Sequence, residues 1–549
     1  MDPISVNVSF DFLKQININE EIEYKISKDT KSKKLNQLQL LILDSNNESI
    51  KDFLKKNIHL FKDEINYQNE RGWTALMMSC RNSNHYSNNE IVKLLLENGS
   101  DPNLQDNEGW TALMFSCNNS NADSNNETVK LLLEYGASPN LQDNDGWSAL
   151  MLSYDDTNDE LYYETIKLLL DYESDVNLKN NNGQTALMMS CTYSNTGYNI
   201  ETVKILLYHE ADVNLKDNEG MTALMMSCIY SNTDSNIETV ELLLNHEADV
   251  NLKDNEGMTA LMMSCRNSST DSNIETVKLL LDRKADVNLK NNDGMSALML
   301  SCGYTNVNSN IETVKLLLDY GADVNLKDNN GWSALMLSCG KSNTCSTIET
   351  VKLLLDYGAD VNLKNNNGMT ALIVSCNDSN KDSSTETVEL LLDYKADVNL
   401  KNNNGYTALM YSCRFINTDS NNETVKLLLN DDNIDVNIVS NDAKHNALMI
   451  LCENNTNQHE IAKLLKSKTN LNHRNDQNKK IEDICLEEYK YLFLITLEDI
   501  LKKHQTIKSE CFICTEEEVD CIKCEFDHFT CIECLSKVKY NCEACRKPF

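Results

Sequence analysis

A period of 37 residues runs through most of this 549-residue chain and limits what the chain can fold into. Glycine stands at the same place in ten successive units, as Gly72, Gly109, Gly146, Gly183, Gly220, Gly257, Gly294, Gly331, Gly368 and Gly405. A cysteine follows eight residues behind nine of these glycines, and Tyr154 is the one substitute. A fixed period of this length indicates a solenoid, in which each unit buries its apolar face only against its neighbours.

Each unit predicts two helices and an extended finger. In the unit that starts at Gly220, the apolar segment 222–228 predicts a short first helix. Ser235 and Glu238 have the spacing of a capping box at the start of a second helix, whose apolar residues follow three and four apart. Asp, Asn and Gly residues then predict a turn-rich hairpin that leads back to the next unit.

This unit resembles the ankyrin repeat. Gly-x-Thr-Ala-Leu-Met stands where that family has Gly-x-Thr-Pro-Leu-His, and Leu-Leu-Leu-x-x-Gly-Ala-Asp-Val-Asn resembles its second helix and finger. The resemblance covers residues 32–480 and implies a mainly α ankyrin-repeat solenoid of about 10 regular 37-residue repeats with degenerate end repeats. The period exceeds the usual ~33 residues, and we place the extra residues in the polar loop between the helices. Met replaces the family's His, so any hydrogen bond that His supplies is expected to be absent.

The acidic composition excludes some classes of partner. The chain has 84 acidic and 50 basic residues, a formal net charge of −34, whereas nucleic acids and anionic membranes need a basic footprint. The first residues show no secretory signal, and no apolar segment approaches the ~20 residues that span a bilayer. We therefore expect an intracellular, most simply cytoplasmic, protein. Its 20 cysteines are then expected to be reduced thiols and metal ligands.

Four segments follow from these patterns: an N-terminal leader at 1–31, the solenoid at 32–480, a connecting amphipathic helix at 481–508 and a cysteine-rich domain at 509–549. Long repeat arrays of this composition resemble those of large DNA viruses of amoebae and of slime moulds.

Two columns of side chains vary between units and are the candidates for partner binding. The first column directly follows the glycine: Trp73, Trp110, Trp147, Gln184, Met221, Met258, Met295, Trp332, Met369 and Tyr406. The second lies five residues on: Met78, Phe115, Leu152, Met189, Met226, Met263, Leu300, Leu337, Val374 and Tyr411.

In ankyrin proteins these columns typically face the concave groove that holds partners. The resemblance thus implies a groove that is apolar and aromatic along its whole length. Its protein-binding residues would be Trp73, Trp110, Trp147, Trp332 and Tyr406, since Trp, Tyr and Met are favoured interface anchors. The alternative is that these large side chains simply pack on one another and close the stack.

The last 39 residues concentrate metal-ligating side chains. Nine possible ligands occur as Cys511-x2-Cys514, Cys521-x2-Cys524, His528-x2-Cys531-x2-Cys534 and Cys542-x2-Cys545. A Cys-x2-Cys pair places two thiolates within one tetrahedral coordination sphere, so the spacing predicts two zinc ions.

The order of these ligands resembles the RING finger of ubiquitin ligases. The resemblance implies that one zinc takes Cys511, Cys514, Cys531 and Cys534 and that the other takes Cys524, His528, Cys542 and Cys545. Cys521 in place of Cys524 is the open alternative. Ile513 matches the residue that meets the ubiquitin-conjugating enzyme, and Arg546 matches the arginine that steadies the conjugated ubiquitin.

Two features depart from the RING pattern: Glu543 stands where the family usually has Pro, and segment 535–541 is short and lacks Trp. The expected function is that of a ubiquitin ligase without covalent catalysis of its own, in which the repeats bind a protein substrate and the RING recruits the conjugating enzyme. The alternative is a non-catalytic interaction scaffold with a structural zinc module.

Overall fold

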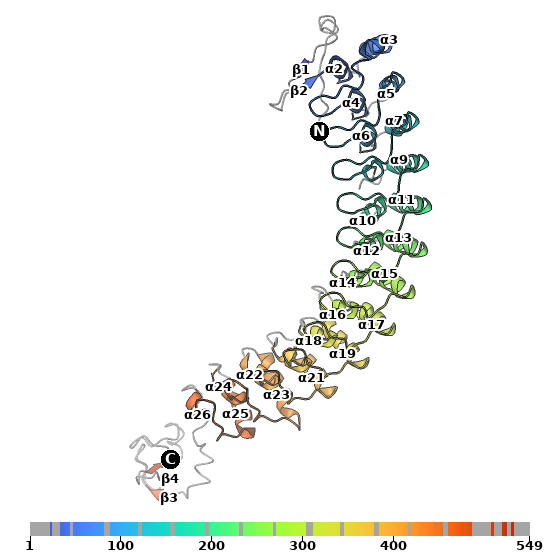
Figure 1. Cartoon of the computed structure of the whole chain (residues 1–549). Helices are drawn as coiled ribbons and strands as arrows, with labels where there is room; N and C mark the ends of the chain where they lie inside the picture. Colours follow the sequence, from blue (N-terminus) through green and yellow to red (C-terminus); the bar gives the residue numbers. More distant parts are fainter. Residues whose placement is uncertain are drawn as a thin grey trace. The chain divides into compact units, whose positions relative to one another are not determined.

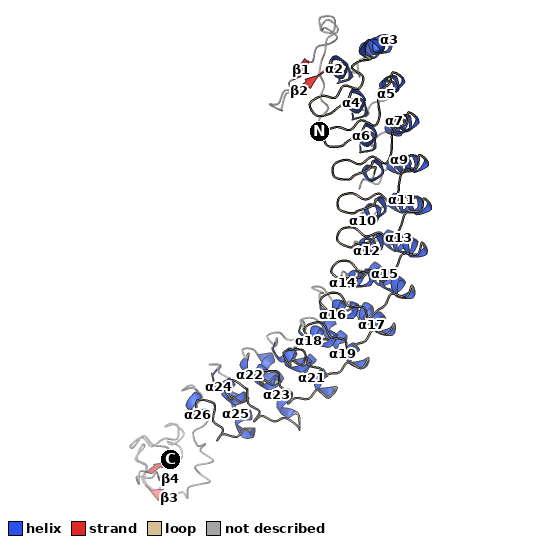
Figure 2. Ribbon diagram, viewed as in Figure 1, coloured by secondary structure: helices blue, strands red, loops and turns tan. Residues whose placement is uncertain are grey.

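The computed structural model of the chain describes most residues of the repeats and several short segments outside them. The described residues are 22–24, 33–43, 48–81, 88–118, 123–153, 160–192, 197–229, 234–266, 271–303, 311–340, 345–377, 384–415, 419–453, 459–485, 507–509, 519–523 and 529–531. The chain forms two compact units, Met1–Asn292 and Asp293–Phe549. Within each unit, helix pairs stack side by side with their fingers on one side (Figure 1, Figure 2).

The described residues of the first unit form six regular helix pairs. Its first helices are α4 (Ala75–Arg81), α6 (Ala112–Asn118), α8 (Ala149–Leu152), α10 (Ala186–Thr192), α12 (Ala223–Ile229) and α14 (Ala260–Arg266). Its second helices are α5 (Asn88–Glu97), α7 (Asp123–Glu134), α9 (Glu160–Asp171), α11 (Gly197–Tyr208), α13 (Asp234–Asn245) and α15 (Asp271–Asp282). From α4 to α12, each first helix packs on the next first helix of this unit, and all six pack on their own second helices, as a repeat array requires.

The second unit continues the same pattern. Its first helices are α16 (Ala297–Gly303), α18 (Ala334–Gly340), α20 (Ala371–Asn377), α22 (Ala408–Arg414) and α24 (Ala447–Glu453). Its second helices are α17 (Ile311–Asp319), α19 (Cys345–Asp356), α21 (Ser384–Asp393), α23 (Asp419–Asn430) and α25 (His459–Lys468). Helices α24 and α25 follow the ten regular repeats and agree with the degenerate end repeat expected from the sequence.

A degenerate repeat also begins the array, as expected. It consists of α2 (Gln37–Leu43), α3 (Glu48–Asn57) and the 3-10 helix η1 (Ile58–Phe61), and α2 packs on α4. The buried Gln39 side chain donates through Nε2 to the carbonyls of Tyr67 (3.2 Å) and Trp73 (2.6 Å). Strand β1 (Ile22–Tyr24) pairs antiparallel with β2 (Lys33–Leu35). The rest of the leader at 1–31 lies outside the described residues.

The other end of the array extends a few residues past the expected boundary at 480. Helix α26 (Ile481–Ile484) packs on α24, and Cys485 behind it is buried. Most of the expected connecting helix, residues 486–506, lies outside the described residues. Ile507 and Lys508, at its end, differ from that expectation, because they belong to strand β3 (Ile507–Ser509). Strand β3 pairs with β4 (Val519–Lys523), and β4 pairs with β5 (Phe529–Cys531), both antiparallel.

Threonine or serine caps each regular first helix, and the helix itself is buried. In the first repeat, Thr74 Oγ1 accepts from Met77 N at 3.2 Å, which satisfies one of the backbone donors left open at a helix start. The Thr74 N–H in turn lies 3.3 Å from Met77 Sδ, and Thr111 and Met114 repeat this contact at 3.4 Å. In these two repeats the methionine sulfur thus accepts a weak hydrogen bond at the place where the family has His.

The fingers are joined by a ladder of hydrogen bonds between successive repeats. Asn218 donates through its backbone N to Asn182 O (3.0 Å) and through Nδ2 to Asn181 O (2.8 Å). Within one finger, Asp217 Oδ1 accepts from Glu219 N (2.9 Å) and Met221 N (2.8 Å). Because equivalent bonds recur along each unit, the residue after the repeat glycine has a fixed backbone position in every repeat.

The chain makes left-handed turns after the second helices, at the place where the ankyrin pattern has Gly. The non-glycine residues at this position have φ of +61° to +66°: Glu173, Glu210, Glu247, Lys284 and Lys395. The helix start differs from the one that the expected capping box implies. Ser235 would have to precede the helix, whereas α13 already begins at Asp234. The serine side chains themselves lie outside the described residues.

Candidate protein-binding groove

All five residues expected to bind a partner are half-buried on the finger side of the first helices. Trp73, Trp110 and Trp147 lie in the first unit, and Trp332 and Tyr406 lie in the second. Each backbone N–H donates to the Oδ1 atom of the Asp or Asn four residues before it, at 2.7–3.0 Å. These bonds within each finger hold the backbone of the aromatic residue in place, and part of each ring stays accessible.

In the first unit, the aromatic rings contact one another. Phe115 lies between Trp73, with ring centroids 5.4 Å apart, and Trp110, with centroids 5.0 Å apart. The Arg81 guanidinium lies 4.6 Å from the centre of the Trp73 ring, a cation–π distance. Burial lowers the pKa of Arg81, and the nearby Arg71 adds to that effect. These side chains pack on each other, as the packing alternative expects, and also present surface. Binding of a partner by that surface stays a prediction.

A second aromatic group lies in the second unit. Tyr411 is 5.7 Å from Tyr406 and 6.3 Å from Phe415, measured between ring centroids. Arg414 lies over both outer rings, 5.8 Å from Tyr406 and 5.7 Å from Phe415. Burial raises the pKa of Tyr406, and the negative charge of Asp442, which accepts from the Tyr406 hydroxyl at 3.3 Å, acts in the same direction. The tyrosine is therefore a hydrogen-bond donor at neutral pH.

Burial differs among the side chains of the first column. Gln184 interrupts the column, and the three methionines that follow it lie mostly within the stack: Met221, Met258 and Met295 are only 9%, 4% and 7% exposed. Met369, further along the column, is half-buried like the aromatic residues. The unbranched methionine side chain can follow irregular gaps in a core, whereas the rigid indole cannot. Accessible aromatic surface is thus confined to the repeats that carry Trp or Tyr.

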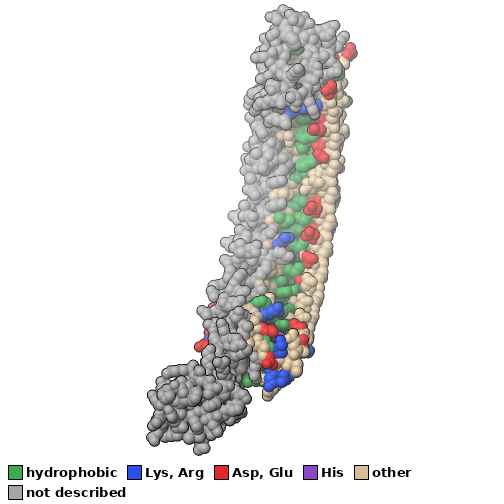
Figure 3. All heavy atoms as spheres, turned by 90° about the vertical axis from the view of Figure 1, so that its left-hand side faces the viewer, with side chains coloured by type: hydrophobic (Ala, Val, Ile, Leu, Met, Phe, Trp, Pro, Cys, Tyr) green, Lys and Arg blue, Asp and Glu red, His purple; other side chains and the backbone are tan. Residues whose placement is uncertain are grey.

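Acidic side chains line the finger edge beside this column in the first unit. Glu108, Asp145, Glu219 and Glu256 each stand directly before a repeat glycine and are exposed. Figure 3 shows a band of hydrophobic side chains with acidic side chains along its edge. Around Met221 and Met258 the surface is hollowed into a groove of about 570 Å³, whose lining includes Glu219, Glu256 and Arg266.

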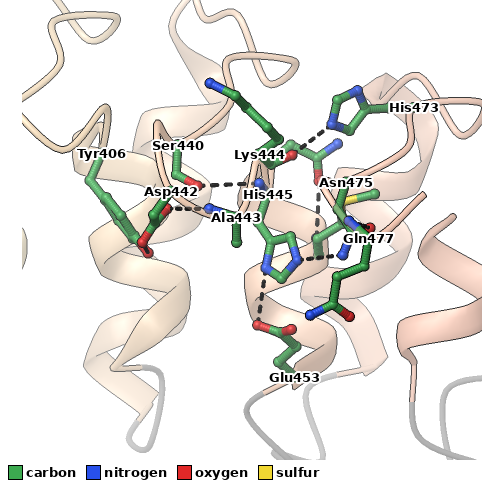
Figure 4. A network of polar contacts seen from close by, with 12 residues as sticks. Tyr406, Ser440, Asp442, Ala443, Lys444, His445, Glu453, His473, Asn475 and Gln477 are labelled. Carbon is green, nitrogen blue, oxygen red and sulfur yellow. Dashed lines mark hydrogen bonds and ion pairs between the residues drawn. The ribbon is translucent and has the colours of Figure 1, made fainter. Parts of the chain in front are cut away.

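The first column ends in a polar cluster at His445 (Figure 4). The buried His445 ring lies with Nδ1 3.1 Å from Glu453 Oε2 and with Nε2 2.9 Å from Asn475 Nδ2. Asn475 Oδ1 already accepts from the backbone N–H groups of Gln477 and Lys479, so its amide nitrogen faces the ring as donor. His445 Nδ1 then carries the proton and donates to Glu453. The ring therefore joins Glu453, in α24, to Asn475, in the finger that follows α25.

The expected zinc ligands fall largely outside the described residues. The backbone of two of the nine is described: Cys521 in β4 stands directly opposite Cys531 in β5 in the antiparallel register. Ile513, Arg546 and the other ligands are not among the described residues. Within the described part of the chain, no group of His, Cys, Asp or Glu is arranged to hold a metal ion. The two-zinc arrangement therefore stays a prediction.

Comparison with known proteins decides the family. Eight overlapping segments match the family described as ankyrin repeats (three copies): residues 38–124, 83–161, 121–217, 156–254, 194–291, 231–328, 268–365 and 342–440. The chain belongs to the ankyrin-repeat family. Members of this family generally bind protein partners. Separately, no helix of the described residues has the length and apolar character to cross a membrane.

Several ankyrin repeat proteins of Acanthamoeba polyphaga mimivirus are similar to parts of this ankyrin-repeat chain. One is 41% identical over 73 residues, which is 13% of either chain. A second is 56% identical over 50 residues, 9% of this chain and 8% of the relative, and a third is 36% identical over 64 residues, 12% and 10%. The chain therefore spans only about a tenth of the length of these relatives. The expected likeness to repeat arrays of large amoebal viruses is confirmed.

Sequence reasoning missed the charged residues that accompany the two columns. Arg81 and Arg414 lie over aromatic rings, and both follow the repeat cysteine directly, a position that varies between units. The acidic residues before the glycines have the pattern of ordinary finger-tip charges. Comparing these two further positions between units would have found both sets.

Proposed function

We propose that the ankyrin array captures a partner protein through its half-buried aromatic side chains. One observation carries this proposal: Trp73, Trp110 and Trp147 keep accessible ring surface although the ladder fixes their backbones. Rigid, partly exposed Trp and Tyr side chains supply large contact area at low entropic cost and are enriched among interface hot spots. The charge balance of the chain argues for a protein partner over a nucleic acid.

The test replaces Trp110 and Trp147 by Gln, because Gln184 already occupies the equivalent place in the next repeat. We expect partner capture from host lysate to fall at least tenfold, the loss of about 1.4 kcal/mol or more of binding free energy. The thermal melt should stay near that of the parent chain. Tyr208→Ala is the control, since Tyr208 is 81% exposed on a second helix. Equal capture by parent and variant, or a collapsed melt, would leave the rings as packing elements.

The cysteine-rich segment is the second part of the proposal: it binds two zinc ions. Support comes from the donor set, eight Cys and one His in 35 positions, and thiolate and imidazole are the ligands zinc prefers. Cys511, Cys514, Cys531 and Cys534 would hold one ion, and Cys524, His528, Cys542 and Cys545 the other. Bound zinc would supply much of the folding energy of this short segment.

Elemental analysis of the full chain should return two zinc ions. The repeat cysteines do not confuse this count, because burial raises the pKa of thiols such as Cys228 to about 12 and keeps them protonated. Cys524→Ser should release metal, whereas Cys521→Ser should not. The reverse result would make Cys521 the ligand, and a count near zero would remove the zinc module.

The finer proposal is that this module recruits a ubiquitin-conjugating enzyme, so that a captured protein is held where its lysine can attack the thioester. Its support is the position of Ile513 and Arg546 within the ligand pattern. The non-catalytic scaffold is at least as consistent with the family match.

Autoubiquitination with a panel of conjugating enzymes separates these two functions. Arg546→Ala and Ile513→Ala should each abolish or weaken chain formation at unchanged zinc content. If the parent chain is inactive, Glu543→Pro tests whether that departure is responsible. Inactivity of both leaves the scaffold.

A further inference from the structure

The groove beside Met221 and Met258 in the first unit has a floor and an edge of different chemistry. Met221, Met258 and Met263 form the floor, and the ends of α12 and α14 supply Ile229 and Arg266 on one side. The finger tips supply the other side, with Glu219, Asp254, Asn255 and Glu256. The lining thus carries three carboxylates against one guanidinium, a formal charge of 1 − 3 = −2.

The backbone that carries the glutamates on the finger side is held in a fixed place. Glu219 O accepts from Asn255 N at 2.9 Å, and Glu256 O accepts from Asn292 N at 2.9 Å, so the backbone of both residues belongs to the ladder. Their side chains are exposed and stand one repeat apart. Two negative charges at a repeating distance beside an apolar floor complement a segment that alternates basic and apolar side chains.

We propose that this groove binds an extended segment of a partner protein in which Lys or Arg alternates with aliphatic residues. The proposal rests on the proposed function and names the chemistry of its partner. Methionines on the floor can adapt to aliphatic side chains of different shape, and the carboxylates select cations on the finger side. The net charge of −34 favours approach of such a segment before it docks.

The experiment titrates the full chain with three labelled peptides of about ten residues: alternating Lys–Val, alternating Glu–Val and alternating Lys–Ser. We expect the Lys–Val peptide to bind at least about tenfold more tightly than either of the others, because only it satisfies both floor and edge. Tighter binding of Glu–Val, or equal binding of Lys–Ser, would overturn the proposal.

Matched variants locate the binding. Glu219→Asn with Glu256→Asn should weaken the Lys–Val peptide roughly fivefold to tenfold, as expected for two exposed ion pairs. Asn is already present at this position as Asn182 and Asn330. The control is Glu210→Asn with Glu247→Asn. It also removes two negative charges, but from the turns after the second helices of neighbouring repeats.

Equal weakening by both pairs of substitutions would show general charge attraction and refute the groove. Met258→Gln places in this repeat the side chain that the chain itself carries as Gln184. It should also weaken the peptide, and an unchanged affinity would contradict an apolar floor. Partner capture that depends on Trp110 and Trp147 is a separate readout. It can succeed while the Lys–Val peptide fails, and then only the peptide class is wrong.

Discussion

At the scale of single residues, positive φ angles occur at two kinds of position with different surroundings. A Cβ added to Gly220 (φ +80°) would lie 2.8 Å from Asn255 N of the next finger. A Cβ added to Gly358 (φ +84°) would meet nothing within 4 Å. In the ten regular repeats, Glu and Lys replace only glycines of the second kind. Close approach of the fingers, rather than φ alone, therefore requires the glycine before the first helix.

The first prediction compares these positions. Gly358→Ala should destabilise the chain by about 1 kcal/mol, the cost of a left-handed non-glycine residue, and Glu210→Gly should stabilise it by a similar amount. Gly220→Ala should cost about 2 kcal/mol more than Gly358→Ala, because the Asn255 backbone must also move. Urea unfolding followed by circular dichroism measures all three. Equal losses at Gly220 and Gly358 would contradict the role of the finger contact.

The sequence pattern could predict one of these two features. Glu210 stands where the repeat pattern has glycine, a residue typical of left-handed turns, and its φ is +64°. The contact between Gly220 and Asn255 could not be predicted, because a pattern read within one unit does not say which atoms of the next unit approach it. The burial of Met258 was missed for a similar reason: the column predicts a face of the repeat, but the flexible side chain decides which way it turns.

At the scale of the helices, the repeat cysteine and a serine of the next first helix form a buried row. Cys80 hydrogen-bonds Ser116, Cys117 hydrogen-bonds Ser153, and Cys191 hydrogen-bonds Ser227. Each serine also donates to the carbonyl four residues before it, as Ser116 does to Ala112 at 3.2 Å. Burial raises the pKa of these thiols from 9.0 to about 12 despite the serine contacts, which act the other way.

The second prediction is a loss of stability in alkali. A folded-state pKa of about 12 against 9.0 when unfolded means that the unfolded chain releases these protons first. The contribution of these thiols to stability should then be constant below pH 9 and should be lost as the pH rises from there toward 12. Each cysteine contributes a slope of at most about 1.4 kcal/mol per pH unit.

Urea midpoints between neutral pH and the alkaline range measure this slope. Cys191→Ala with Cys228→Ala removes two thiols and should flatten it, although cavity formation lowers stability at every pH. A slope that is the same in parent and variant would assign the alkaline loss to lysine and tyrosine groups.

At the scale of the whole molecule, the main helix contacts among the described residues of each compact unit join neighbouring repeats. The first helix α12 packs on α10 and α14, and α13 packs on α11 and α15. The sequence period was enough to predict this architecture, because ten units in register repeat the same apolar pattern. It was not enough for the segment at 481–508, where a single amphipathic pattern has no second copy to support it, and Ile507 proved to lie in a strand.

The third prediction removes one complete repeat, residues 220–256. The new junction joins Glu219 to Gly257 and reproduces the native Glu256–Gly257 sequence. The shortened chain should fold with the same helical content per residue and with a thermal melt close to that of the parent. Circular dichroism and size-exclusion chromatography check this. Removal of 220–237 alone is the control, and it should give misfolded protein because a second helix would follow a finger directly.

The ladder between fingers has a consequence for how such a chain can change in evolution. Its donor and acceptor are the same backbone atoms in every repeat, as in Asn218 N to Asn182 O and Asn255 N to Glu219 O. Unequal recombination between the near-identical coding segments adds or removes whole units, and each product keeps every ladder bond. The number of repeats can therefore change without loss of folding. The length of the array then changes by one repeat at a time, and each added repeat brings the side chains of the repeat from which it was copied.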